Sequence, residues 1–230
     1  MQQIPLDLQW PLRQRFEYFH PGPANAAALN LVRSAAQTAG PWVFLQGPSG
    51  SGRTHLLMAA CRQAIDRGQT SQYIPLRGLR DRSLERLRGF AGANLLALDD
   101  LDVLFGDGPA EHALFDLYNT CRAAGDTLLM ASLQTPVAAQ LPDLRSRLSG
   151  CAQARLQLLD DTGRREVLCR QASVRGLQLD ASVLDWLFHH HARDLGTLMA
   201  LLERIDHAAL AEQRRITVPF IRHLLASASH

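Results

Sequence analysis

The chain contains the stretch Gly47-Pro48-Ser49-Gly50-Ser51-Gly52-Arg53-Thr54. This stretch matches the phosphate-loop pattern G-x-x-x-x-G-K-[ST] at every position except 53, where arginine replaces lysine. Its glycines allow successive backbone N–H groups to turn inward around phosphate oxygens, and a following helix would direct its N-terminal dipole at the same anion. A Gly/Ser-rich linker is the alternative, but an apolar strand and an amphipathic helix do not usually bracket a linker. The stretch therefore predicts a phosphate-binding loop.

Short apolar runs and helical stretches alternate on both sides of this loop. Trp42–Leu45 is typical of a buried parallel strand, and the stretch from about Thr54 to Arg67 has an apolar helical face that ends at Gly68. Such alternation predicts an α/β fold, with a parallel sheet covered by helices on both faces. Further strands are expected at residues 72–74, 94–98 and 127–131, and further helices at residues 25–36 and 111–124.

The pattern changes after Leu158, where strand-like runs cease and an all-helical domain is expected. The predicted organisation has an extended tail over residues 1–12, an α/β domain over 13–158 and a small helical domain over 159–230. A cleft between two such domains is a natural ligand site. The helical stretches of the second domain run over residues 162–175, 180–191, 194–213 and 217–226.

Arginine at position 53 affects the expected chemistry of the loop. Its positive charge is retained, so phosphate binding is expected to survive. Its planar guanidinium cannot replace a compact ammonium that bridges two phosphate groups. All 24 basic residues of the chain are arginine, for which a GC-rich genome is the simplest explanation. We therefore expect nucleotide binding without fast intrinsic hydrolysis.

Two acids follow the apolar run Asn94–Leu98. A strand that ends at Asp99 would place this carboxylate beside the phosphate loop, where it could hold Mg²⁺ through water next to the Thr54 hydroxyl. Asp100 could then orient an attacking water. The alternative is a strand followed by an ordinary acidic turn, and the phosphate loop earlier in the chain favours the nucleotide site.

The composition indicates an ordinary globular protein. Of its 230 residues, 47% are hydrophobic and 20% are charged, which excludes an intrinsically disordered chain. No apolar run approaches the roughly 20 residues of a membrane helix, and the N-terminus lacks the regions of a secretory signal, so a cytoplasmic location without a membrane partner is expected. The net charge of +2 is too small to indicate nucleic-acid binding by itself. The cysteines, which are expected to be buried free thiols, are Cys61, Cys121, Cys151 and Cys169.

Taken together, these features resemble the DnaA branch of the AAA+ ATPases, and within it the short DnaA homologues that regulate the replication initiator. The resemblance covers nearly the whole chain. It implies an AAA+ α/β base domain followed by a small all-helical lid domain. Besides the phosphate loop and the acid pair, it is carried by Phe16–Asn25 (the N-terminal box), Leu128–Pro136 (sensor 1), Leu141–Leu148 (the arginine-finger box) and Ala192–Thr197 (sensor 2).

The resemblance assigns roles to two arginines. Arg147 stands at the position of an arginine finger that acts in trans on a partner's nucleotide, and Arg193 would reach the phosphates from the lid. Without the resemblance, both would be ordinary solvated arginines. The expected cofactors are ADP or ATP with Mg²⁺. The expected nucleotide-binding residues are Gly47, Gly50, Ser51, Gly52, Arg53, Thr54, Asp99, Asp100 and Arg193, with Thr54 and Asp99 at the metal.

The segment that resembles sensor 1 departs from the family pattern. Leu133 stands where a polar or acidic residue is usual, and a leucine side chain cannot orient a water or contact a γ-phosphate. Together with Arg53, this departure favours an activator of the DnaA ATPase that has little hydrolysis of its own.

The N-terminal residues resemble the peptide that binds the β sliding clamp of DNA polymerase III. In the segment Gln3-Ile4-Pro5-Leu6-Asp7-Leu8, the side chains of Leu6 and Leu8 would enter an apolar cleft, and Gln3 would hydrogen-bond at its rim. Because the motif is short, the expectation of clamp binding depends mainly on the family resemblance.

The resulting expectation is a negative regulator of replication initiation. The chain would bind a nucleotide, dock on the DNA-loaded clamp and stimulate ATP hydrolysis by DnaA through Arg147. DNA would be contacted mainly through the clamp, and a homodimer is left open. An initiator is disfavoured, because we find neither an origin-reading helix-turn-helix domain after the lid nor an N-terminal helicase-loading domain. The alternatives are a self-sufficient AAA+ ATPase of the helicase-loader type, a DNA-binding module, and a DnaA-like scaffold with a non-functional nucleotide site.

Overall fold

The computed structural model describes most of the chain as two compact units, residues 1–158 and residues 159–230. Within the described residues, no helix is both long and apolar enough to cross a membrane. The described residues are 14–37, 41–78, 87, 89–190, 195–212 and 216–226.

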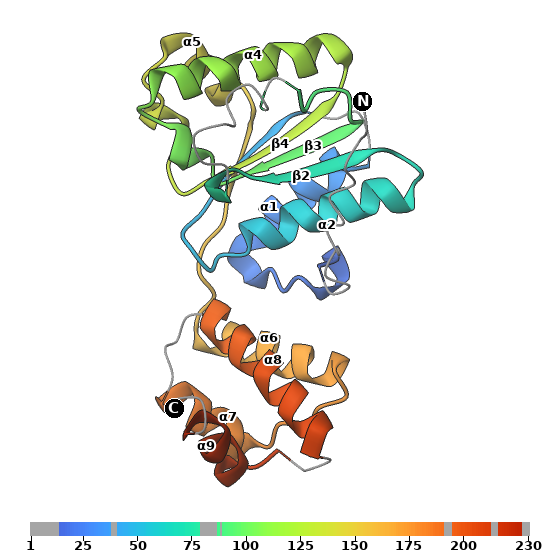
Figure 1. Cartoon of the computed structure of the whole chain (residues 1–230), viewed down its shortest axis with the longest axis vertical. Helices are drawn as coiled ribbons and strands as arrows, with labels where there is room; N and C mark the ends of the chain where they lie inside the picture. The colour runs from blue at the N-terminus through green and yellow to red at the C-terminus, as the bar shows by residue number, and fades with distance from the viewer. Residues whose placement is uncertain are drawn as a thin grey trace. The chain divides into compact units, whose positions relative to one another are not determined.

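The first unit is a five-stranded sheet with helices on both faces (Figure 1). Its strands are β1 (Val43–Gln46), β2 (Ser71–Pro75), β3 (Leu95–Asp99), β4 (Thr127–Ser132) and β5 (Ala152–Arg155). Its α-helices are α1 (Gly22–Ala35), α2 (Arg53–Asp66), α4 (Gly108–Ala124) and α5 (Pro142–Ser149). Short 3₁₀ turns are η1 (Phe16–Tyr18), η2 (Leu76–Gly78), η3 (Leu101–Leu104) and η4 (Pro136–Ala138).

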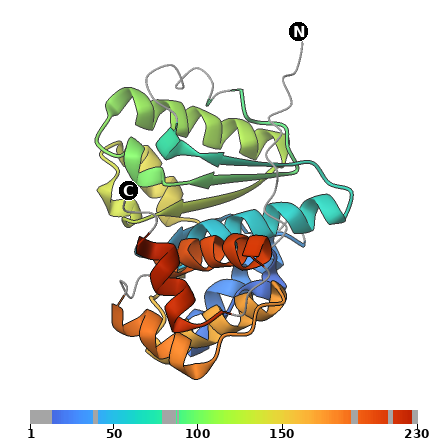
Figure 2. The same ribbon diagram turned by 60° about the horizontal axis from the view of Figure 1, so that its bottom comes forward.

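All strand pairs are parallel, and the strand order is β2-β3-β4-β1-β5. In the register, Val43 of β1 lies between Leu129 of β4 and Ala152 of β5. Helix α4 lies on one side of the strands and α2 on the other (Figure 2). This arrangement confirms the predicted parallel sheet flanked by helices.

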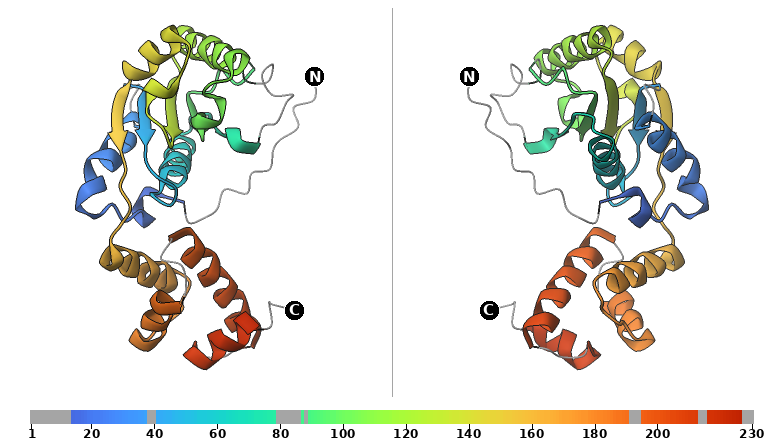
Figure 3. Two further views of the ribbon diagram at one scale, coloured as in Figure 1. Left: turned by 90° about the vertical axis from the view of Figure 1, so that its left-hand side faces the viewer. Right: turned by 90° about the vertical axis from the view of Figure 1, so that its right-hand side faces the viewer.

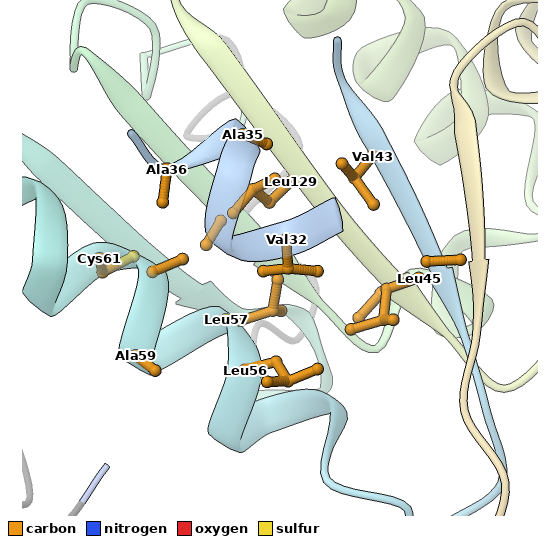
Figure 4. Packing of buried hydrophobic residues seen from close by; sticks show 14 of the residues in the cluster. Val32, Ala35, Ala36, Val43, Leu45, Leu56, Leu57, Ala59, Cys61 and Leu129 are labelled. Atoms are coloured by element: carbon orange, nitrogen blue, oxygen red, sulfur yellow. The ribbon is translucent and has the colours of Figure 1, made fainter. Parts of the chain in front are cut away.

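Alternate residues of each strand enter opposite cores, because successive side chains of a strand point to opposite faces. In β1, Val43 and Leu45 pack with α1 and α2, whereas Phe44 packs with α4 and α5. Figure 4 shows the first core, where Val32 of α1 and Leu57 of α2 meet the strands. Burial on both faces explains why these strands are apolar runs rather than alternating polar and apolar residues.

Strand β5 was not among the predicted strands. Its sequence, Ala152-Gln153-Ala154-Arg155, contains no β-branched or aromatic residue, so it carries little local strand signal. It pairs with β1 at the edge of the sheet, as Figure 3 shows. Its extended conformation therefore depends on a partner strand that lies far away in the sequence.

The second unit contains the four predicted helical stretches within its described residues. Its helices share a buried core that includes Leu168, Leu187, Leu202 and Ile221. At the start of the last helix, the Phe220 N–H donates to the Thr217 hydroxyl at 3.4 Å, so Thr217 caps this helix. The helices are α6 (Asp161–Val174), α7 (Ala181–His190), α8 (Leu195–Glu212) and α9 (Val218–Ala226).

The cysteines follow the sequence prediction with one exception. All four are free thiols, and Cys61, Cys121 and Cys151 are buried, but Cys169 on α6 is exposed. Burial raises the pKa of Cys61 and of Cys121 to about 12, so these two thiols stay protonated at neutral pH. The described residues contain no group of three potential metal-ligating side chains.

Glu111, in the first turn of α4, fastens the start of α5 to the rest of the first unit. Its side chain is fully buried and accepts hydrogen bonds from the backbone N–H groups of Gly106 (2.8 Å), Gln140 (2.9 Å) and Leu141 (2.6 Å). Burial raises the pKa of Glu111, but these hydrogen bonds and the charge of Arg145 outweigh it, so the net pKa lies below the ordinary 4.5. The carboxylate is therefore charged in the folded protein.

We expect Glu111→Gln to destabilise the first unit by about 1–3 kcal/mol, because an amide cannot accept all three of these N–H groups. The lowered pKa means that this carboxylate stabilises the fold above its unfolded pKa and that the stabilisation is lost as pH falls through the folded pKa. The variant should consequently lose less stability than the wild type between pH 6 and pH 3. Urea unfolding at several pH values measures both effects, and Glu203→Gln, at an exposed position, is the control. If the stability of wild type and of Glu111→Gln fell in parallel with pH, the stabilising role of the Glu111 carboxylate would be contradicted.

Candidate functional site

The phosphate loop joins the end of β1 to the start of α2 and lies at the carboxyl edge of the sheet. The Gly47 N–H donates to the Ser132 carbonyl of β4 at 3.2 Å, so the loop leaves the sheet alongside the neighbouring strand. At the other end of the loop, the Thr54 hydroxyl donates to Asp99 Oδ2 of β3 at 2.6 Å. The structure thus brings together the predicted loop and the predicted acid.

Glycine is required at several points of this loop. Gly50 and Gly52 have φ values of 79° and 96°, in the left-handed region that side chains disfavour. A Cβ at Gly47 would lie 2.5 Å from Ser51 Oγ, and a Cβ at Gly52 would lie 2.6 Å from the Phe19 ring. The loop is therefore closely packed, and its conformation depends on small residues.

Two buried polar groups of the loop lack hydrogen-bond partners within the part of the chain that the structure describes. They are Ser51 Oγ and Arg53 Nη1. Buried polar groups are nearly always hydrogen-bonded, so each such exception calls for an explanation. An anionic group in the loop would supply acceptors to both, and the donors present fit the polyphosphate of a nucleotide.

Asp99 is the central acceptor of the site. Besides the Thr54 hydroxyl, its buried carboxylate accepts the Tyr73 hydroxyl at 3.0 Å and the Asp100 N–H at 2.9 Å. Burial and the negative charge of Asp99 raise the pKa of Tyr73, so the phenol remains a donor. Thr54 and Asp99 together form the pair of oxygen ligands that could hold Mg²⁺ beside a nucleotide.

Arg53 is buried, with 8% of its surface exposed, and it faces two acids of the β3–η3 turn. Its guanidinium forms ion pairs with Asp100 at 3.6 Å and with Asp102 at 3.9 Å. Arg77, after β2, contacts the same two acids. Asp102 and Arg77 were not among the predicted site residues, although the run Asp99-Asp100-Leu101-Asp102 contains a third acid as a signal in the sequence.

Leu133 takes part in this cluster through its backbone. Its N–H donates to Asp102 Oδ1 at 2.9 Å, whereas its side chain is 37% exposed. The end of β4 is thereby linked to the acids, but position 133 contributes no polar side chain.

The N-terminal box packs against the phosphate-loop helix. His55 in the first turn of α2 lies 5.4 Å from the Phe19 ring, and its Nε2 is 2.9 Å from the Arg15 carbonyl. Burial lowers the pKa of His55, against the weaker opposite effect of that carbonyl, so the ring is neutral at physiological pH. Asn25 exchanges hydrogen bonds with the backbone N–H and carbonyl of Gln157 at 2.8 and 3.0 Å. Residues before α1 thus support the phosphate-loop helix, and Asn25 of α1 supports the end of the first unit.

Two neighbouring arginines of α5 have different environments. Arg145 donates to the carbonyls of Ala139 at 2.9 Å and Gln140 at 3.4 Å. Arg147 is exposed, and among the described residues its side chain forms no ion pair or hydrogen bond, even with Asp143 one helical turn earlier. Of these two arginines of α5, only Arg147 therefore presents a guanidinium that is available to another molecule.

Arg147 borders a groove between α4 and α5 with a volume of about 460 Å³. The remaining predicted site residues, Gln3, Leu6, Leu8 and Arg193, lie outside the described residues. The groove is lined by Phe115, Tyr118, Arg122, Asp143, Ser146, Arg147 and Gly150.

A parallel sheet with a phosphate loop after β1 and acids after β3 defines an AAA+ type of P-loop domain. The chain belongs to the family of the bacterial DnaA ATPase domain, whose family model matches residues 11–158. The model of the Hda lid domain matches residues 161–225. The two matches confirm the predicted resemblance and support a DnaA-related AAA+ replication regulator of the Hda type.

Solved structures show the same fold at low sequence identity. Domain III of the replication initiation protein DnaA from Thermotoga maritima has a TM-score of 0.77 and 20% identity, over 94% of this chain and 97% of that one. AMPPCP-bound DnaA from Aquifex aeolicus has a TM-score of 0.68 and 23% identity, over 84% of this chain and 65% of that one. The Holliday junction branch migration motor RuvB from Thermotoga maritima has a TM-score of 0.63 and 17% identity, over 87% of this chain and 67% of that one.

We expect Gly52→Ala to weaken binding of a fluorescent adenine nucleotide by at least about tenfold, because the new methyl group meets the Phe19 ring. The left-handed φ adds a further penalty of about 1 kcal/mol for any side chain. Gly68→Ala is the matched control, since Gly68 has a φ of 77° but open space around its Cα. Equal nucleotide affinity of the two variants would show that the contact with Phe19 does not shape the loop.

Proposed function

We propose that this protein is a nucleotide-bound regulator that docks on the DNA-loaded sliding clamp and stimulates ATP hydrolysis by DnaA. The stimulating group is the guanidinium of Arg147, which enters the nucleotide site of DnaA in trans. The observation that carries this proposal is the exposed side chain of Arg147, which has no ion pair or hydrogen bond among the described residues. It lies on α5, within the domain that belongs to the DnaA ATPase family. A cation at that place neutralises charge that builds on the transferring phosphoryl group.

The support of α5 favours such a role. Leu144 and Leu148 are fully buried, and Glu111 holds the backbone at the start of the helix. The exposed face of α5 is therefore fixed while Arg147 remains free. Because the helix is already ordered, only the side chain of Arg147 would have to be ordered when its guanidinium enters a partner's site, and no internal ion pair has to be broken.

The chain's own nucleotide site serves mainly to bind. ADP or ATP would be held by the loop N–H groups, Ser51 and Thr54, with Asp99 at the metal. A bound Mg²⁺ would neutralise phosphate charge. Arg53 and Leu133 replace the side chains that usually bridge the phosphates and sense the γ-phosphate, so intrinsic hydrolysis is slow. A bound nucleotide would then stabilise the face that meets DnaA. Nucleotide-bound DnaA structures of the same fold support this role for the site.

The N-terminal segment supplies the second contact. Gln3, Leu6 and Leu8 match the clamp-binding pattern, and two buried leucine side chains with one hydrogen-bonding amide suffice for a specific peptide contact. Docking on a DNA-loaded clamp would restrict the stimulation of DnaA to the period after replication has begun.

We expect Arg147→Ala to reduce stimulation of DnaA-ATP hydrolysis by at least about 10³-fold, the lower end of the factor that an arginine finger contributes. Arg147→Lys should recover only a small part, because an ammonium lacks the planar fork of a guanidinium. The assay measures phosphate release by ATP-bound DnaA with clamp loaded on DNA. Arg155→Ala is the control, since Arg155 is an exposed arginine on β5 of the same unit.

Full stimulation by Arg147→Ala would overturn the finger assignment. Steady ATP turnover by the pure chain, in the absence of DnaA, would instead favour a self-sufficient ATPase of the helicase-loader type. Purification without bound nucleotide and no measurable nucleotide affinity would favour the scaffold alternative.

We expect replacement of Gln3, Leu6 and Leu8 by alanine to weaken clamp binding by at least about 100-fold, because each leucine contributes about 1.5–3 kcal/mol when buried. Affinity for nucleotide should not change, and this provides an internal control for folding. Surface plasmon resonance with immobilised clamp measures the first quantity, and fluorescence titration the second. Unchanged clamp affinity would remove the tail from the proposal.

A further inference from the structure

Four charged side chains form a closed network at the edge of the nucleotide site. Arg53 lies 3.6 Å from Asp100 and 3.9 Å from Asp102. Arg77 lies 3.2 Å from Asp100 and 3.6 Å from Asp102, through different oxygen atoms of the two carboxylates. Each acid is therefore shared between one buried arginine of the phosphate loop and one exposed arginine of η2.

The two acids are held in place independently of Arg53. Asp100 is the one non-glycine residue with a positive φ, 58°, in the part of the chain that the structure describes, and it accepts a hydrogen bond from Arg77 Nε. Asp102 is nearly buried and accepts the Leu133 N–H at 2.9 Å. Their carboxylates thus form a fixed negative surface that faces the loop.

Arg53 is held by this surface only through charge. Its distances to Asp100 and Asp102 are those of ion pairs without a direct hydrogen bond, and its buried Nη1 has no hydrogen-bond partner in the described structure. A buried guanidinium with unused donors would gain from a closer acceptor. Phosphate oxygens in the loop are such acceptors, so the acids and the nucleotide compete for one cation.

We infer that Asp102 and Arg77 are specificity-determining residues that set the affinity of this site for a nucleoside triphosphate relative to a diphosphate. This inference rests on the nucleotide binding of the proposed function and not on Arg147 or the clamp. The ion pair with Asp102 would compete with a bound polyphosphate for Arg53, and the negative charge of Asp102 would repel the added charge of a triphosphate. Arg77 offsets the charge of Asp100 and Asp102. A triphosphate would be more sensitive to both effects than a diphosphate, because it carries more negative charge.

Substitutions of Asp102 and of Arg77 should change the ATP:ADP affinity ratio in opposite directions. Asp102→Asn removes one negative charge but keeps an oxygen that can accept the Leu133 N–H, so Arg53 turns toward the phosphates and the ATP:ADP affinity ratio rises about tenfold. Arg77→Ala leaves both acids without their exposed partner, so the ratio falls about tenfold. Arg77→Lys should restore the ratio, because a lysine keeps the charge at this exposed position.

The experiment measures the affinity of the full-length protein for fluorescent ATP and ADP analogues, with Mg²⁺ present, at 50 mM and 500 mM salt. Arg62→Ala is the control for loss of a partly exposed, ion-paired arginine on α2, and it should leave the ratio unchanged. The effect of Arg77→Ala should shrink at the higher salt concentration, since exposed charges are screened. Thermal unfolding without nucleotide verifies that each variant is folded.

Changes in the same direction for Asp102→Asn and Arg77→Ala, or equal changes in ATP and ADP affinity, would overturn the inference. Absence of nucleotide binding by the wild type would also overturn it, together with the nucleotide part of the proposed function. Loss of DnaA stimulation in Arg147→Ala is measured separately, so the finger proposal and this inference can fail independently.

Discussion

The hydrogen bond from the Thr54 hydroxyl to the Asp99 carboxylate, 2.6 Å long, joins the two halves of the candidate nucleotide site. It requires Gly52 to take a left-handed conformation, so that α2 begins at the next residue. It also requires β3 to run parallel to β1, because only then does Asp99 emerge at the edge where the loop lies. The buried position of Arg53 and the acids after Asp99 follow from these two conditions.

A separate set of hydrogen bonds in the same unit positions α5, the helix that carries the candidate arginine finger. Glu111 holds the start of α5 through backbone hydrogen bonds, and Arg145 binds carbonyls of the preceding turn. Arg147 is left with no internal partner among the described residues. A rigid helix with a free guanidinium suits the proposed action on another protein, and the same proposal assigns slow hydrolysis to the chain's own site because of Arg53 and Leu133.

Much of the fold was predictable because its elements carry strong local signals. Strands buried on both faces are apolar runs, and the helices show apolar faces, so β1, β3, β4 and α2 agree with the predictions to within about two residues. Strand β5 was missed because alanine, glutamine and arginine give no strand signal. Cys169 was wrongly expected to be buried, since its short helical context does not show which face of α6 is covered.

The residues 47–54 and the acids after β3 were identified from their spacing alone, because a phosphate loop and its metal-side carboxylate depend on local backbone geometry. Spacing could not show that Asp102 and Arg77 complete a charge network, nor that Arg145 is bound while Arg147 is free. The charge network depends on Arg77 of η2 and on Leu133 after β4, which folding brings to Asp102 from other parts of the chain, and the difference between the two arginines depends on how the backbone turns between η4 and α5. The tertiary structure, and not the spacing of residues in the sequence, therefore determines which partner each charged side chain has.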